Sequence, residues 1–110
     1  MKKVSLSAIL LLIIFFNTAV SYAQTTSWKG SVNQNWNLAA NWTNGIPDNT
    51  KDVIIGDANF TGTFQPKVNV VSTCKSVSVG GTIAATLTLT RALTITGNFT
   101  INANGIVDHP

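Results

Sequence analysis

The chain has little of what most catalytic and metal sites require. Its 110 residues include four Asp, one His, one Cys and no Glu, and His109 is penultimate, where a side chain lacks rigid support. No Gly-x-Ser-x-Gly elbow, phosphate-binding loop or dinucleotide fingerprint occurs. Asp48, Asp52 and Asp57 are expected in turns and at strand ends, since their order lacks the EF-hand spacing. We therefore expect a non-catalytic chain with no metal and no cofactor, any catalytic residues lying outside it.

Cysteine is limited to Cys74, which excludes an internal disulfide framework. The residues around it are apolar and β-prone, and free Cys is among the most buried residue types. Lys75 alone does not make the electropositive, partly exposed environment of a reactive thiol. Cys74 is therefore predicted to be a small buried hydrophobe.

Charge is also sparse, because only 10% of the residues are charged. Without Lys2 and Lys3, which lie in the apolar N-terminal segment, five basic residues face four Asp, a net charge of +1. The basic residues are scattered singly and form no stripe that could follow a phosphate backbone. Nucleic acid is therefore not an expected partner.

A long hydrophobic run occurs only at the N-terminus. Two lysines precede the apolar run Ile9–Phe16, and the small residues Ser21 and Ala23 follow it. This pattern predicts a secretory signal peptide over residues 1–23, cleaved after Ala23. The run is shorter than the roughly 20 residues that span a bilayer, so no membrane span is expected after cleavage. We expect a secreted protein or one on the outer cell surface.

All three tryptophans lie in residues 24–50, a Trp-rich segment that ends in turn formers. One hypothesis is a carbohydrate-binding platform on Trp28, Trp36 and Trp42, with glycans or cell-surface polymers as partners. In it, nearby amide side chains bond to sugar hydroxyls, namely those of Asn33, Asn35, Asn41 and Asn44. The other is a hydrophobic cap, in which each ring buries about 150–250 Å². A small domain without disulfides needs such burial, which favours the cap, and the solvent exposure of the rings distinguishes the two.

Residues 51–110 form a region of short predicted strands. Apolar residues alternate with Thr and Ser, which puts one face of each strand in a core. Helix is confined to a turn or two near residues 37–40. The predicted strands are Asp52–Ile55, Lys67–Val71, Ser76–Val79, Ala85–Thr90, Ala92–Thr96, Asn98–Ile101 and Gly105–Val107.

The spacing of these strands is shorter than hairpins usually give. The first apolar residues of the last five runs are 10, 6, 6 and 7 residues apart, against roughly 8–12 for hairpins. The spacing predicts an all-β fold, a right-handed parallel β-solenoid with residues 24–50 as N-terminal cap and residues 51–110 as first coils. A small β-sandwich of the immunoglobulin type is the alternative.

Asn and Gly are expected at the corners of the coils, because both tolerate a left-handed backbone. No C-terminal cap is visible, and a repeat array needs one. We therefore expect the array to be incomplete at its C-terminus. The expected corner residues are Gly97, Asn98, Asn102, Asn104 and Gly105.

A series of motifs resembles a known group of proteins. In order, they are Trp28-x-Gly30, Trp36, Asn41-Trp42, Gly45-Ile-Pro47-Asp48, Asp52–Ile55, the segment starting at Cys74, and Leu-Thr-Leu and Leu-Thr-Ile repeats. The order is similar to the N-terminal region of large secreted surface proteins of the Bacteroidota type. That resemblance implies export, commonly through the type IX secretion system, and a structural or adhesive role.

A weaker resemblance is to the G8 domain of extracellular proteins, which shares Trp residues before a Pro-containing turn and an Asp-x-Val-Ile-Ile strand. No functional residue carries over from it. The alternative function from another class is a carbohydrate-binding module, or the leading segment of a β-helical polysaccharide-active enzyme.

Overall fold

A computed structural model describes residues 24–110, and the predicted signal peptide lies outside them. The described chain is all-β, as predicted, with one three-residue 3₁₀ helix, η1 (Ala39–Asn41). The strands are β1 (Gln24–Ser27), β2 (Lys51–Ile55), β3 (Lys67–Val68), β4 (Ser72–Cys74), β5 (Ser76–Val79), β6 (Ala85–Leu89), β7 (Leu93–Ile95), β8 (Phe99–Ile101) and β9 (Gly105–Asp108).

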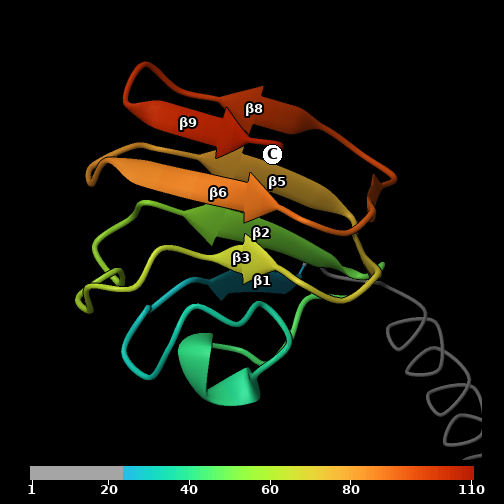
Figure 1. Ribbon diagram of the computed structural model, residues 1–110, viewed down its shortest axis with the longest axis horizontal. Coiled ribbons are helices and arrows are strands. Elements are labelled where there is room, and N and C mark those ends of the chain that lie inside the picture. The colour runs from blue at the N-terminus through green and yellow to red at the C-terminus, as the bar shows by residue number, and fades with distance from the viewer. Residues whose placement is uncertain (1–23) are drawn as a thin grey trace, which may run out of the picture.

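The strands form three parallel sheets, in the orders β1-β2-β5-β8, β3-β6-β9 and β4-β7. Figure 1 shows two of these sheets as layers of strands, with β1 near the bottom and β8 and β9 at the top. Every pairing between these strands is parallel. An immunoglobulin-like sandwich is built from antiparallel sheets, so that alternative is wrong.

From β2 onward, the chain returns to each sheet at a nearly constant interval along the sequence. In the first sheet Val53 pairs with Val77, and Val77 pairs with Phe99. In the second sheet Val68 pairs with Leu89, and the pairings of β6 with β9 and of β4 with β7 have a similar spacing. Between two visits to the first sheet, the chain contributes a strand to each of the other two.

The constant register places like residues in rows across the first sheet. Thr26, Val53, Val77 and Phe99 are successive partners in one row. Side chains alternate between the two faces of a strand, so every member of the row points to the same side. The row is buried at β2 and β5 and exposed at β8, since Val53 and Val77 are 1% and 2% exposed while Phe99 is 45% exposed.

The other two sheets contribute rows to the same core. Val68 of β3 pairs with Leu89, and buried Leu87 of β6 pairs with Val107. In the third sheet, buried Cys74 pairs with Ile95. Apolar rows on the three sheets therefore form one hydrophobic cluster, together with the three tryptophans.

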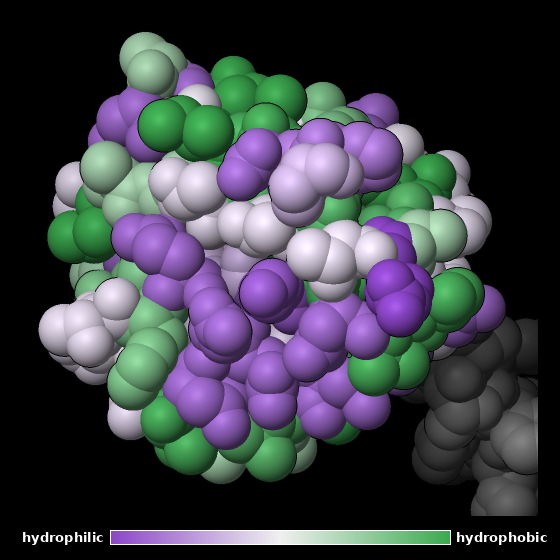
Figure 2. All heavy atoms as spheres, in the orientation of Figure 1, coloured by the Kyte–Doolittle hydropathy of each residue, from purple (hydrophilic) through white to green (hydrophobic). Residues whose placement is uncertain are grey.

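Hydropathy follows this arrangement on the face drawn in Figure 2. Hydrophilic side chains gather over the lower middle of the face, where the loops beneath β3 lie, and hydrophobic atoms occur along the bottom rim and at the top, over β8 and β9. Phe99 and Ile101 of β8 and Ile106 of β9 are exposed. The end of the stack at β8 and β9 thus leaves apolar side chains exposed.

Some strands differ from the predicted ones. β3 stops at Val68, not Val71, and Val70 and Val71 are exposed, so two apolar residues that favour a strand lie outside it. β1 was not predicted, because its sequence Gln-Thr-Thr-Ser lacks apolar alternation. The segment interpreted as a cap therefore begins with a strand of the four-stranded sheet.

Four of the five expected corner residues, Gly97, Asn98, Asn102 and Asn104, lie between strands as predicted. The expectation of a left-handed backbone at these five residues is wrong. Positive φ angles occur within residues 24–110 at Gly30, Gly45, Gly56 and Gly80, and at no other residue type. Asn102 and Asn104 act through their side chains instead: the Asn102 Nδ2 donates to the Gly80 carbonyl at 2.6 Å, and Asn104 bonds to both the N–H and the carbonyl of Gly81. Gly105 lies in β9, close to the Val79 carbonyl.

Replacing Gly80 by Ala is expected to destabilise the fold by about 1–3 kcal/mol. Its φ is +86°, and an added Cβ would lie 2.6 Å from the Asn104 Oδ1. Gly81→Ala is the matched control, since Gly81 has no positive φ and its Cβ would lie 3.2 Å from the Gly56 carbonyl oxygen. Urea denaturation of the two variants gives the comparison, and equal losses would contradict this account of the corner.

Candidate functional site

The three predicted platform residues form one buried cluster. Trp42 lies between Trp28 and Trp36, with ring centroids 5.0 Å apart and interplanar angles of 77° in both pairs. Such edge-to-face packing is a favoured geometry for aromatic pairs. Trp28 and Trp36 are 0% exposed and Trp42 is 2% exposed. No ring offers a face to solvent, so a sugar could stack on one only if the cluster opened.

Two of the three indole N–H groups have partners. The Trp28 Nε1 donates to the Phe64 carbonyl, and the Trp42 Nε1 to the Trp36 carbonyl, each at 2.7 Å. The Trp36 Nε1 is buried and has no hydrogen-bond partner among residues 24–110. A buried donor left unpaired costs about 1–3 kcal/mol, so the ring of Trp36 is held by packing alone.

A buried asparagine holds the loop around the cluster. The Asn41 side chain, 0% exposed, accepts from the N–H groups of Val32 and Asn33 and donates to the Asn33 side chain and the Asn35 carbonyl. The carbohydrate-platform hypothesis gave Asn41 a possible role in bonding to sugar hydroxyls, because nothing in its local sequence marks it as buried. Its hydrogen bonds satisfy the loop backbone instead.

The same segment closes the outer edge of β1. The Thr43 N–H donates to the Ser27 carbonyl, the Lys29 N–H donates to the Asn41 carbonyl, and Trp28 and Trp42 form an antiparallel bridge. The Asn44 side chain donates to the Thr25 carbonyl. The segment therefore supplies the partners that a neighbouring strand would otherwise give, which is the arrangement a cap requires.

Cys74 is buried, as the sequence predicts. Burial raises the pKa of its thiol to about 11, and the negative charge of Asp52 acts in the same direction. A thiol with a raised pKa is almost entirely protonated at neutral pH, and the thiolate is the nucleophile. Cys74 therefore behaves as a small apolar core residue.

The aspartates take turn and strand-end roles. Asp48 accepts from the Thr50 N–H and hydroxyl, and the hydroxyl bond and then the N–H bond lower the pKa of Asp48. Asp57 accepts in the same way from the Asn59 N–H. Within residues 24–110, no three His, Cys, Asp or Glu side chains come together in a group that could hold a metal ion.

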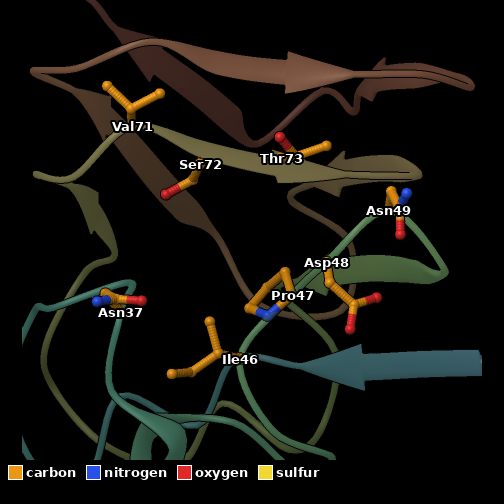
Figure 3. Close-up of a pocket in the computed structure, with 8 residues that line it drawn as sticks. All are labelled: Asn37, Ile46, Pro47, Asp48, Asn49, Val71, Ser72 and Thr73. Carbon is orange, nitrogen blue, oxygen red and sulfur yellow. The ribbon is translucent and has the colours of Figure 1, made fainter.

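One surface cleft combines polar and apolar groups. It lies between the start of β4 and the loop before β2, and its volume is about 360 Å³. Figure 3 shows β4 on one side of it and the Ile46–Asn49 segment on the other, with Asn37 at one end. Its lining residues are Asn37, Ile46, Pro47, Asp48, Asn49, Val71, Ser72 and Thr73. Sequence reasoning missed this cleft, because its residues come from three separate segments.

Comparisons with known proteins give no match, so the function is inferred from the fold and the cleft. The chain matches no protein-family model, no curated protein and no solved structure. In the part of the chain that the structure describes, no helix is long and apolar enough to cross a membrane.

The unpaired Trp36 N–H predicts unequal effects of Trp→Phe substitutions. Trp28→Phe and Trp42→Phe each remove an indole hydrogen bond and leave a carbonyl without it, whereas Trp36→Phe removes a donor that has no partner. All three lose similar ring volume. We expect the first two to be about 1–3 kcal/mol less stable than Trp36→Phe in chemical denaturation. If Trp36→Phe is the most destabilising, an unseen partner holds its N–H.

Cys74 should resist alkylation and make stability depend on pH. At pH 8, iodoacetamide should modify the folded chain about 100-fold more slowly than the urea-unfolded chain, because the thiol pKa rises from 9.0 to about 11 on folding.

As pH rises, the Cys74 thiol of the unfolded chain loses its proton before that of the folded chain. The contribution of this thiol to the stability of the fold is therefore present below pH 9 and is lost between pH 9 and about 11. Cys74→Ala removes the titrating group, and in denaturation series across this pH window its stability should fall less than that of the wild type. Parallel pH profiles for the two proteins would contradict the assignment.

Proposed function

We propose that this chain is a non-catalytic structural or adhesive β-domain of an exported or cell-surface protein. In this proposal the three sheets are the first coils of a right-handed parallel β-solenoid, and the Trp-rich segment is its N-terminal cap. The domain acts as the starting unit of a rod, on which further coils stack. The observation that carries the proposal is the nearly constant sequence interval between paired strands from β2 onward.

The rows of the core support stacking as the source of stability. A coil of three short strands has no core of its own and buries its apolar side chains against the coils above and below it. Val77 is 2% exposed with partners on both sides, whereas Phe99 of the same row has one neighbour and is 45% exposed. A further coil placed on β8 would bury Phe99 as β8 buries Val77.

The difference between the two ends supports a direction of growth. At β1, the segment with Trp28 and Trp42 covers the strand edge with backbone hydrogen bonds. At the opposite end, β7, β8 and β9 each have a strand neighbour on one side only. An unprotected strand edge beside exposed apolar side chains is a template for pairing. In the proposal, this open end receives the next coil within a larger surface protein.

The chemistry and the sequence pattern are in accord with a scaffold. Cys74 is buried, and Asp48 and Asp57 hold turns. The motifs from Trp28 to the Leu-Thr repeats resemble the start of secreted surface proteins of the Bacteroidota type. A structural or adhesive role requires an exported, regular surface and no reactive group. Export by the signal peptide over residues 1–23 belongs to the same proposal.

Duplicating one coil tests the stacking. The segment 76–97 spans one interval in the first sheet, since Val77 pairs with Phe99, and a second copy of it is inserted after Gly97. A solenoid should accept the coil in register and gain stability, because each added repeat contributes a new interface. Circular dichroism and urea denaturation of wild type and duplicated protein measure the effect.

A scrambled copy of the segment 76–97 is the control, because it keeps composition and length but removes the alternation. We expect the duplicated protein to be more stable than the wild type and the scrambled one to be less stable. Equal destabilisation by both inserts would show that the fold does not propagate by coils.

A further inference from the structure

The cleft beside β4 exists because the strand ladder stops there. The Ser72 N–H donates to the Ala92 carbonyl and the Cys74 carbonyl accepts from the Thr96 N–H, so Ser72 and Cys74 direct their backbone groups toward β7. In a parallel ladder alternate residues point to opposite edges. Thr73 therefore directs its N–H and carbonyl away from β7, toward the cleft that it lines.

The segment across the cleft does not continue the ladder. Pro47 has no N–H to offer a strand, and the Asp48 carboxylate is held in a turn with Thr50. The cleft thus separates a free strand edge from a turn, as Figure 3 shows. No strand within residues 24–110 pairs with β4 on this side.

The polar side chains of the cleft are available to a ligand. The hydrogen bonds within residues 24–110 leave the side chains of Asn37, Asn49 and Thr73 unused, and those to Asp48 engage its Oδ1 and leave its Oδ2 open. This contrasts with the asparagines of the Trp-rich segment that were expected to bind sugar, whose side chains are all engaged: Asn33, Asn35, Asn41 and Asn44.

The apolar wall complements these groups. Pro47 and Ile46 face the cleft from one side, and Val71, which is 70% exposed, lines the other. Small-molecule sites combine an apolar surface with a few placed polar groups, in volumes of roughly 300–1,000 Å³, and the volume of about 360 Å³ lies at the low end. A pyranose ring has matching chemistry, with C–H faces for the apolar wall and hydroxyls for the amides and the carboxylate.

We infer that this cleft binds one uncharged sugar unit of a glycan. Of the described residues, Asp48 is the only charged one that lines it. A carboxylate accepts hydrogen bonds from sugar hydroxyls while it repels acidic sugars. An added peptide strand is less suited to the site, because three-residue β4 offers the backbone groups of Thr73 alone, and strand addition relies on repeated main-chain bonds. The inference does not depend on coil stacking.

A titration followed by amide NMR tests the site with three sets of probes at concentrations up to about 10 mM. The probes are uncharged glucan, mannan, galactan and xylan oligosaccharides, an oligogalacturonate, and an alternating Val-Thr peptide. At least one uncharged oligosaccharide should shift the amides of residues 46–49 and 71–73, and oligogalacturonate should bind at least tenfold more weakly. No shift with any uncharged probe, or shifts confined to other residues, overturns the inference, as does preferential binding of the peptide.

Matched variants link binding to the cleft. Thr73→Val should weaken binding about three- to tenfold through the loss of one hydrogen bond, and Thr94→Val, its register partner on β7, should leave binding unchanged. Asp48→Asn should weaken binding tenfold or more, since bonds to charged groups are stronger. Asp57→Asn is its control, because Asp57 accepts from the N–H two residues ahead as Asp48 does. Equal effects in a variant and its control would place the sugar elsewhere.

Discussion

A parallel strand can pair with its own successor only after the chain has crossed back to the starting edge of the sheet, and that crossover usually needs a helix. From β2 onward, this chain makes the crossover with strands of two other sheets. The nearly constant interval between paired strands is therefore a geometric requirement of the fold. This interval sets the register between paired strands. The register aligns apolar side chains in rows across the sheets, and these rows form the core.

The Trp-rich segment is held in place by the core and by two strands. Its three indoles belong to the hydrophobic cluster. Its backbone bonds to β1 through the Thr43 N–H and the Ser27 carbonyl, and to β3 through the Trp36 N–H and the Lys67 carbonyl. Within residues 24–110 the indole N–H of Trp36 meets no acceptor, so this ring contributes through its packing.

The sequence predicted the all-β class and most of the strands, and it missed β1 and β4. Apolar residues alternating with Thr located β5 to β9 because alternation is itself the consequence of a strand with one buried face. β1 escaped detection because its buried residues are polar: the Thr26 and Ser27 hydroxyls donate to the Gly45 carbonyl and the Asp57 carboxylate. Asn41 was misjudged for a similar reason: burial of a polar residue depends on partners supplied by the folded loop, which local sequence does not specify.

The candidate sites likewise divide into a feature that the local sequence suggested and one that only the folded chain creates. The aromatic residues suggested a sugar platform on Trp28, Trp36 and Trp42. Large rings contribute most to stability when they leave water, and all three are buried in the hydrophobic core. The cleft, in contrast, lies where strand pairing stops. Pro47 has no N–H to donate to the free edge of β4, so the backbone N–H and carbonyl of Thr73 have no strand partner there. Of the cleft residues, Ile46 also packs against the hydrophobic core. The polar cleft residues Asn37, Asn49 and Thr73 are not members of the buried core cluster, whereas all three tryptophans are.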